Sequence, residues 1–374
     1  MTGSNYLTVA YDQRTGAKLW TRRTSGGTDE LHAIAVSPSG SMLYVTGTRE
    51  MPVTDEDVFT IAYDAATGTT RWSARYNQSR GGESLEDFGD AIAVSPDGSK
   101  VFVAGSSGGP FALLVAYNAE TGARLWARSL RRSSWFFALA ASPDSSRVYT
   151  TGGVDTPTQF SNDLTMAFDA SNGSTLWSRQ YNGPAGGEDG GNLIAVSPDG
   201  SRLYVSGASS KLGEPGWTAG FLDWATIAYR ANTGTRLWAK RYESGVPLSI
   251  AVAPAGDNVY VYGSSDQPGS AVVAYAASSG AIRWIARSTM GWGRAALSPD
   301  GTNLYVTRRS VAGYVTTAYS ESGGLLWTTR ALAISEETIA VGVSPDGHEV
   351  FVTGSVFVAG STSPFQILMA AYAG

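Results

Sequence analysis

The sequence predicts an all-β protein made of four-stranded antiparallel sheets, and three observations lead to this prediction. Short runs of β-branched and aromatic residues, bounded by Gly, Pro and Asp, recur along all 374 residues. No stretch shows a sustained helical period. Two motifs alternate along the chain, and each occurs seven times with a mean period of about 50 residues, which is typical of repeat architectures.

The first motif predicts two strands of each repeat. Its first copy is Ala10-Tyr-Asp-Gln-Arg-Thr-Gly-Ala-Lys-Leu-Trp20. We expect a third strand that ends in Ala-Tyr, a turn at Asp-x-x-Thr-Gly, and a fourth strand that carries the Trp. The copies span residues 10–20, 62–72, 116–126, 167–177, 228–238, 274–284 and 318–327.

The second motif predicts the other two strands. One copy is Ser95-Pro-Asp-Gly-Ser-Lys-Val-Phe-Val-Ala-Gly105. Its Pro presets φ, its Asp caps the backbone and its Gly takes a left-handed φ, so Ser-Pro-Asp-Gly is a tight turn. The first strand precedes this turn and the second follows it. The motif prolines are Pro38, Pro96, Pro143, Pro198, Pro254, Pro299 and Pro345.

Seven such sheets arranged radially form a seven-bladed β-propeller, and we expect residues 1–374 to be a single domain of this kind. The third-strand motif recurs at the C-terminal end as Met369-Ala-Ala-Tyr372, while the N-terminal residues supply a third and a fourth strand before any first strand. We therefore expect the last blade to combine strands from both termini and to close the ring without open edges. The sequence leaves open which terminal third strand fills this blade.

Both motifs resemble repeats of known propeller families. Ala-x-Asp-x-x-Thr-Gly-x-x-x-Trp resembles the tryptophan-docking repeat of PQQ-like propellers, and Ser-Pro-Asp-Gly-x-x-Leu-Tyr-Val-Thr-Gly resembles the YVTN-type repeat of surface-layer and lactonase-like propellers. The resemblance covers the whole chain and implies the fold but no activity. The PQQ-dependent alcohol dehydrogenases of the wider group are longer, have eight blades and carry a disulfide of adjacent cysteines. This chain has no Cys, so we expect no bound PQQ.

Composition excludes several classes of function. The net charge of −5 argues against a nucleic-acid partner. The absence of Cys excludes a disulfide, a thiolate metal site and a Cys nucleophile. No apolar run approaches the ~18 residues that span a bilayer, so we expect no membrane insertion. A chain without Cys is compatible with export, so a location outside the cytoplasm is favoured. We expect a monomer.

Loop lengths indicate where a functional site lies. The two motif turns keep nearly constant lengths, whereas the connections at the opposite ends of the strands range from the short Arg308–Ala318 to the long Gly207–Ala228. Length variation on a fixed scaffold is typical of binding loops. We therefore expect any site at the strand ends opposite the motif turns.

Aromatic residues at those ends predict a pocket that docks a small molecule, a glycan or a peptide. Four tryptophans lie outside the repeat motif, in the variable connections. The alternative is that long loops use these rings as a small core of their own. The candidate ligand-binding residues are Trp135, Phe137, Asn192, Trp217, Phe221, Trp224 and Trp292.

Three polar residues near the first strands are candidates for catalysis. His32, beside Asp29, Glu30 or Asp90, could act as a general base. Arg294 stands where Ala is the commonest residue, and a buried Arg needs an anionic partner, either Asp90 or another acid, or a ligand carboxylate. An enzyme, such as a lyase, a cyclase or a hydrolase, would use His32, Asp90 and Arg294 as base, orienting group and anion clamp.

Metal binding has weaker support in the sequence. Carboxylates such as Asp29, Glu83 and Asp87 gather in the variable connections and could hold Ca²⁺, but none has the spacing of an EF-hand loop. The other histidine, His348, follows a motif turn, so no His-rich cluster forms and we assign no metal ligand. A basic residue also follows each motif Trp, and we interpret this row as part of the blade and not as a binding patch.

Three functions follow from these patterns. The sequence favours a binding propeller. It also allows an enzyme on the same strand ends, although no Ser-His-Asp signature or phosphate-binding loop is present. The third is a structural or protein-interaction ring without a small-molecule site.

Overall fold

A computed structural model describes most of the chain, and within the described part every regular element is a β-strand. The described residues are 7–12, 15, 17–24, 29–51, 55–80, 83–108, 111–157, 160–211, 222–242, 245–265, 269–289, 291–310, 313–332, 340–357 and 365–373. These residues contain no helix that is long and apolar enough to cross a membrane. The chain divides into two compact units, Met1–Val196 with Ala231–Thr235, and Ser197–Arg230 with Arg236–Gly374.

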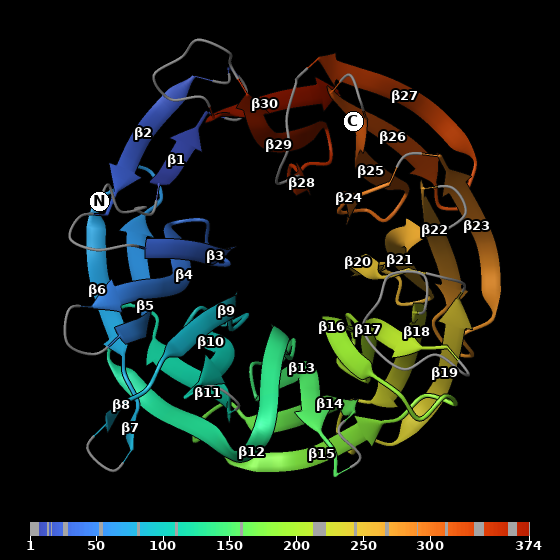
Figure 1. Ribbon diagram of the computed structural model, residues 1–374. Coiled ribbons are helices and arrows are strands. Elements are labelled where there is room, and N and C mark those ends of the chain that lie inside the picture. Colours follow the sequence, from blue (N-terminus) through green and yellow to red (C-terminus); the bar gives the residue numbers. More distant parts are fainter. Residues whose placement is uncertain are drawn as a thin grey trace. The chain divides into compact units, whose positions relative to one another are not determined.

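The first unit contains the first three repeats in full (Figure 1). One sheet has the order β3-β4-β5-β6, and a larger one has the order β15-β14-β13-β12-β11-β10-β9. Two short pairs, β1-β2 and β7-β8, complete the unit. The strands are β1 (Leu7–Tyr11), β2 (Lys18–Arg23), β3 (Asp29–Val36), β4 (Met42–Met51), β5 (Asp55–Asp64), β6 (Thr70–Tyr76), β7 (Ser79–Arg80), β8 (Glu83–Ser84), β9 (Asp87–Val94), β10 (Lys100–Ser107), β11 (Phe111–Asn118), β12 (Arg124–Ala141), β13 (Arg147–Asp155), β14 (Ser161–Asp169), β15 (Thr175–Tyr181) and β16 (Asp189–Val196).

The larger sheet differs from the expectation of separate four-stranded sheets. Strand β12 is 18 residues long and serves as the fourth strand of the second repeat and as the first strand of the third. The motif spacing predicts both strands, but the short link between them also adopts an extended conformation, so the two sheets join into one.

The second unit contains the later repeats. Its sheets have the orders β20-β21-β22-β23, β24-β25-β26-β27 and β28-β29-β30, and the division between the units falls within the sheet β16-β17-β18-β19. The strands are β17 (Arg202–Ser210), β18 (Leu222–Arg230), β19 (Arg236–Tyr242), β20 (Pro247–Val252), β21 (Asn258–Ser265), β22 (Gly269–Ala276), β23 (Ile282–Ser288), β24 (Gly293–Leu297), β25 (Asn303–Ser310), β26 (Gly313–Ser320), β27 (Leu325–Leu332), β28 (Ala340–Val343), β29 (Glu349–Phe357) and β30 (Phe365–Ala373).

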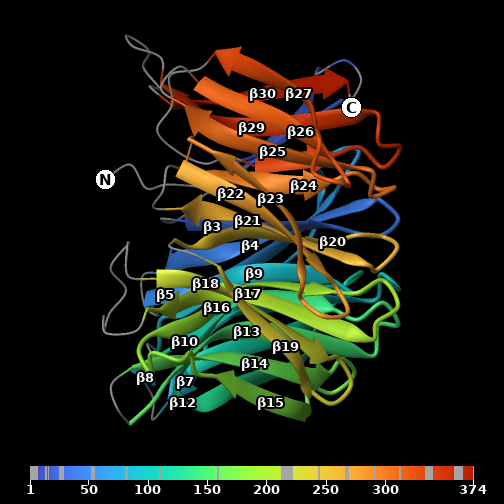
Figure 2. The same cartoon turned by 90° about the vertical axis from the view of Figure 1, so that its right-hand side faces the viewer.

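Both motif turns of a repeat lie at the same end of its sheet, as the sequence predicts. The backbone N–H of Ala65 in the Thr-Gly turn donates to the carbonyl of Ser41 in the Ser-Pro turn, 2.9 Å away, and Ala119 donates to Ser99 in the same way. Equivalent bonds recur in the third, fifth and sixth repeats. Figure 2 shows the tight turns at one end of the strands within each unit.

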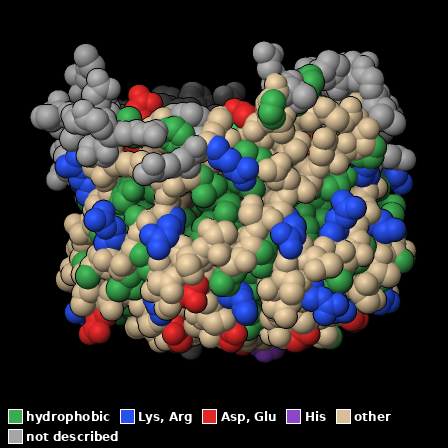
Figure 3. Space-filling view, turned by 90° about the horizontal axis from the view of Figure 1, so that it is seen from below, with side chains coloured by type: hydrophobic (Ala, Val, Ile, Leu, Met, Phe, Trp, Pro, Cys, Tyr) green, Lys and Arg blue, Asp and Glu red, His purple; other side chains and the backbone are tan. Residues whose placement is uncertain are grey.

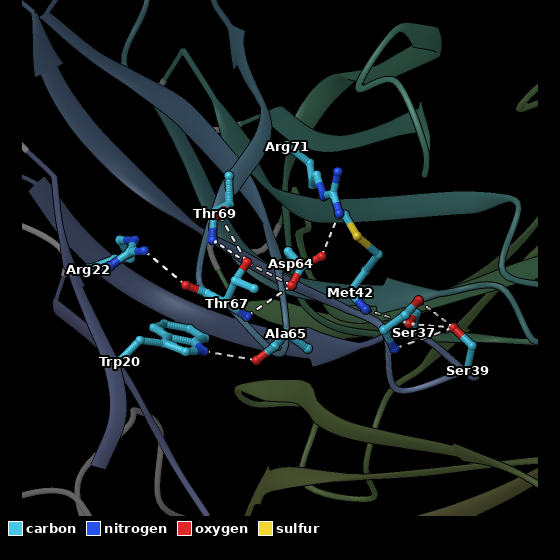
Figure 4. A network of polar contacts seen from close by, with 11 residues as sticks. Trp20, Arg22, Ser37, Ser39, Met42, Asp64, Ala65, Thr67, Thr69 and Arg71 are labelled. Atoms are coloured by element: carbon cyan, nitrogen blue, oxygen red, sulfur yellow. Dashed lines mark hydrogen bonds and ion pairs between the residues drawn. The ribbon is translucent and has the colours of Figure 1, made fainter.

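Six of the seven motif Trp residues dock onto the turn of the following repeat. The Trp20 indole N–H donates to the Ala65 carbonyl at 2.9 Å (Figure 4). The Trp20 ring also covers Gly68. The same bond recurs for Trp72, Trp126, Trp177, Trp238 and Trp284, which donate to Ala119, Ala170, Ala231, Ala277 and Glu321. A Cβ on Gly122 would lie 2.6 Å from the Trp72 ring, so only Gly fits beneath the indole.

The basic residues after the motif Trp strengthen the same contact. Arg22 donates to the carbonyls of Gly68 and Thr67, and Arg128 and Arg179 make equivalent bonds with the next turn. In the first and fourth repeats the arginine stands one residue later and binds an acid of its own sheet: Arg75 binds Asp57, and Arg241 binds Asp223 at 3.0 Å. Figure 3 shows basic side chains spaced between hydrophobic ones over β12 and β15.

The C-terminal copy of the third strand occupies the third position of the last sheet. Strand β30 pairs with β29 along its whole length, and Trp327 packs on Tyr372 with ring centroids 6.4 Å apart. Strands β1 and β2 form a separate pair. The combination of both termini in one blade stays a prediction.

The docking contact predicts unequal effects of alanine at two glycines. Gly122 and Gly40 both have a left-handed φ, +72° and +71°, so Ala at either strains the backbone by about 1 kcal/mol. Nothing lies within 4 Å of a Cβ on Gly40, whereas the Trp72 ring obstructs one on Gly122. We expect Gly122→Ala to lower the free energy of unfolding by about 2 kcal/mol more than Gly40→Ala, measured by urea denaturation. Equal losses would show that indole docking adds nothing to the backbone strain.

Candidate functional site

The predicted site residues His32, Asp90 and Phe137 are bulged residues of three inner strands. Each of these residues has no pairing partner in the second strand of its sheet, although the residues on both sides of it are paired. Leu248 in the fifth repeat is left unpaired in the same way. A bulge removes one residue from the ladder and turns its side chain in a new direction. These bulges lie at the strand ends opposite the motif turns, where the sequence predicts a site.

The glycine that ends each second-strand motif makes room for the bulge. A Cβ on Gly105 would lie 2.0 Å from the Phe88 carbonyl oxygen, and one on Gly152 would lie 1.9 Å from that of Trp135. Neither backbone carbonyl could move without breaking the ladder. The sixth repeat has Arg308 in place of this Gly and has no bulge, so Arg294 pairs directly with Thr307.

The structure brings His32 and Asp90 together from neighbouring sheets. The His32 Nδ1 lies 3.3 Å from Asp90 Oδ1, and its Nε2 lies 3.7 Å from Glu30 Oε2. The hydrogen bond with Asp90 raises the pKa of His32 above its usual value of 6.5, and partial burial opposes this shift. The His32 side chain is 25% exposed, so this pair is open to solvent and to a ligand.

Phe137 and Trp135 form an aromatic pair in the first unit, and Asn192 lies on a strand that packs against theirs. Phe137 is 46% exposed and meets the half-buried Trp135 edge to face, with centroids 6.2 Å apart. Strand β12, which carries both rings, packs against β16, which carries Asn192. The Trp135 Nε1 and the Asn192 Oδ1 are buried and have no hydrogen-bond partner among the described residues. The unused donor therefore lies on the ring that contacts Phe137, and the unused acceptor lies on the adjacent strand β16.

Buried carboxylates secure the connections next to these bulges. Asp87 Oδ2 accepts from the Gln78 N–H at 2.6 Å, and Asp189 Oδ2 accepts from the Gly183 N–H at 2.7 Å. Burial raises the pKa of Asp87 to about 6 and the pKa of Asp163 to about 7. No group of three or more acidic or His side chains within the described part of the chain could hold a metal ion.

The position of Trp224 differs from the prediction for this residue. We expected it among the ligand-binding residues, but it is fully buried, and its indole N–H donates to the Ser264 carbonyl at 3.0 Å. Its ring covers Gly263, whose Cβ would lie 2.7 Å from Cζ2. Trp224 is therefore a packing residue of the second unit, as the alternative interpretation of the loop tryptophans holds. Trp217 and Phe221 lie outside the described residues.

The buried arginine near the first strand of the sixth repeat is Arg308, and not Arg294. Arg294 is exposed and donates to the Gly293 carbonyl at 3.1 Å, whereas Arg308 is completely buried. Within the described residues Arg294 forms no ion pair with an acid, which was one expected outcome. Sequence analysis missed Arg308, although its replacement of a glycine that ends the other six motifs is a visible signal.

Comparison with known proteins assigns the family. A family model described as outer membrane protein assembly factor BamB matches residues 3–106, 54–226, 110–267 and 223–364. The chain belongs to this family. The match to the BamB family agrees with the PQQ-like repeat that the tryptophan motif resembles. No curated protein matches the chain.

Solved structures show the fold of this BamB-family chain. BamB from Moraxella catarrhalis is 16% identical with a TM-score of 0.56, over 96% of this chain and 90% of that one. Kuenenia stuttgartiensis hydrazine synthase is 15% identical with a TM-score of 0.58, over 96% and 99%. The β-propeller domain of Cps50 (Swd1) from Myceliophteria thermophila is 12% identical with a TM-score of 0.55, over 92% and 96%. The chain is therefore an all-β protein of the β-propeller class.

Trp224 and Trp292 of the second unit should differ in their contribution to stability. Trp224→Ala removes a fully buried ring, and we expect a loss of about 3–5 kcal/mol in the free energy of unfolding. Trp292 is 62% exposed, so Trp292→Ala should change it by no more than about 0.5 kcal/mol. Urea denaturation of both variants measures the difference. A comparable loss in Trp292→Ala would make Trp292 a packing residue too.

The His32–Asp90 pair predicts a pH-dependent contribution to stability. Because the folded-state pKa of His32 is raised, the contribution is complete below the unfolded value of about 6.5 and is lost as pH rises through the folded value. The stability difference between wild type and His32→Gln should therefore be larger at about pH 5.5 than at about pH 8. Asp90→Asn should lower the His32 pKa, measured by NMR titration. An unchanged pKa in this variant would contradict the pairing.

Proposed function

We propose that this chain is a seven-bladed β-propeller, closed by strands from both termini, that binds a ligand at the strand ends opposite its motif turns. Trp20 near one terminus covers Gly68 of the next sheet, and Trp327 packs on Tyr372 of the last strand. Both terminal segments thus take part in the docking contact between repeats, which supports closure. We further propose that the Ser-Pro-Asp-Gly turn belongs to the YVTN type.

The observation that carries the binding function is the unused hydrogen-bond donor of Trp135 and the unused acceptor of Asn192, on strands that pack together. Buried polar atoms are nearly always paired, so an unpaired buried donor beside the exposed Phe137, with an unpaired buried acceptor on the adjacent strand, favours a bound partner. The group suits a ligand with hydroxyl or amide groups beside an apolar face, such as a small molecule, a glycan or a peptide. The description of the family as an assembly factor favours a peptide segment.

The test is a binding screen against a glycan array and a random peptide library, with and without Ca²⁺. We expect hits whose affinity falls about tenfold in Phe137→Ala and in Asn192→Leu, because one removes the apolar contact and the other the acceptor. Leu176→Ala is the matched control, since Leu176 is an exposed apolar residue on the outer strand β15 of the same unit. Hits that survive both site variants, or no hits at all, would contradict this site. We expect no dependence on PQQ.

A second candidate is an enzyme, and the contact between His32 and Asp90 favours it. A carboxylate that orients an imidazole and raises its pKa is an arrangement that general bases use. Arg294, the third member of the expected group, belongs to the other unit. Activity profiling with lyase, cyclase and hydrolase substrates tests the idea, and an activity that persists in His32→Gln would reject it.

A further inference from the structure

The loop before β24 presents a tryptophan from a fixed backbone. The Trp292 carbonyl accepts from the Arg309 backbone N–H at 2.9 Å, and the preceding carbonyl, of Gly291, accepts from the Tyr262 hydroxyl at 2.6 Å. The indole is nevertheless 62% exposed. Two bonds thus hold the main chain while the ring projects into solvent, so binding through this ring would cost little ordering of the loop.

A buried positive charge lies beside this loop. The Arg308 guanidinium donates to the hydroxyls of Ser270 at 3.2 Å, Thr317 at 3.1 Å and Tyr319 at 3.1 Å. It also lies over the rings of Tyr262 and Tyr319, at 5.7 and 5.9 Å from their centroids. These partners accept hydrogen bonds from three of its five N–H donors, and none of them carries a negative charge. The charge is therefore solvated by dipoles and not neutralised.

Arg294 adds a second positive charge at the surface. It is exposed, and it follows Gly293, the direct strand partner of Arg308. Within the described residues neither Arg294 nor Arg308 forms an ion pair with a carboxylate. The whole chain has a net charge of −5, whereas these two side chains are both positive. The acidic side chains elsewhere on the protein would repel an anionic partner, whereas Arg294 and Arg308 would attract it.

We propose that Trp292 and Arg294, with Arg308 behind them, form a docking surface for an acidic segment of a partner protein. Trp and Arg are the residue types that most often dominate the energy of protein interfaces. Small-molecule sites are concave and enclose most of their ligand, whereas Trp292 projects from the surface, so the geometry fits a longer partner. The acidic segment places a carboxylate on Arg294 and packs an apolar group on the indole.

The proposal stands apart from the ligand site around Phe137. The Phe137 site belongs to the first unit and Trp292 belongs to the second, and the two sites have no residue in common. Either site could fail its test while the other passes.

The test begins with panning of a random peptide library on the full chain. We expect enrichment of peptides that contain Asp or Glu together with an apolar residue. Fluorescence anisotropy then compares one enriched peptide with its counterpart in which Gln and Asn replace Glu and Asp. We expect the neutral peptide to bind about tenfold more weakly, and the same loss for the acidic peptide with Trp292→Ala and with Arg294→Glu.

Two controls separate this surface from general effects. Leu326→Ala changes an exposed apolar residue of β27, at the opposite edge of the sheet from β24, and should leave the affinity unchanged. Thermal denaturation checks that Trp292→Ala and Arg294→Glu remain folded. Enrichment without acidic residues would overturn the proposal, and so would equal affinity for the neutral peptide. Binding of free glutamate as tight as that of the peptide would overturn the choice of a protein segment.

Discussion

The contact on which the architecture depends is the indole of one repeat seated on the glycine of the next. An isolated four-stranded sheet cannot bury both of its faces, so each repeat needs its neighbours. The indole supplies apolar area, one hydrogen bond to a turn carbonyl, and a shape that only glycine can accept, as at Trp72 and Gly122. The turn must therefore have a fixed length and sequence, and this requirement explains why the motif ends of the strands are uniform.

The opposite ends of the strands are free of this requirement. There a glycine within the second strand accompanies a bulge in four repeats, and the bulged residue is His, Asp, Phe or Leu. The same β-bulge thus presents a different side chain in each of these repeats. The sixth repeat exchanges the glycine for Arg308, loses the bulge, and gains a buried charge instead.

Much of the fold could be predicted from the sequence because its determinants are local. The Pro and Gly of the turns set their own backbone angles, and the spacing of the motif Trp places it on the outer strand. The continuity of β12 could not be predicted, because it depends on how residues between two motifs bridge two sheets. The bulge positions were chosen as candidates by alignment alone, since a bulge arises from pairing between strands.

The candidate site was harder to predict, because exposure is a property of packing. Trp224 and Trp292 are both tryptophans in variable connections, yet Gly263 lies under the first and seals it in the core, and the second projects into solvent. The difference between Arg294 and Arg308 follows the same rule, since neighbouring sheets decide which guanidinium is covered. The sequence therefore identified candidate residues, but it could not predict which of their side chains are buried and which are exposed.

The indole bonds all run in one direction, from each repeat to the one that follows it in the chain. Every complete repeat therefore offers a donor at its outer strand and an acceptor at its turn. If one whole repeat were excised, the two repeats newly brought together would still meet as donor and acceptor. The repeats are thus joined by one kind of polar contact that always points the same way along the chain, from an outer strand to the next turn.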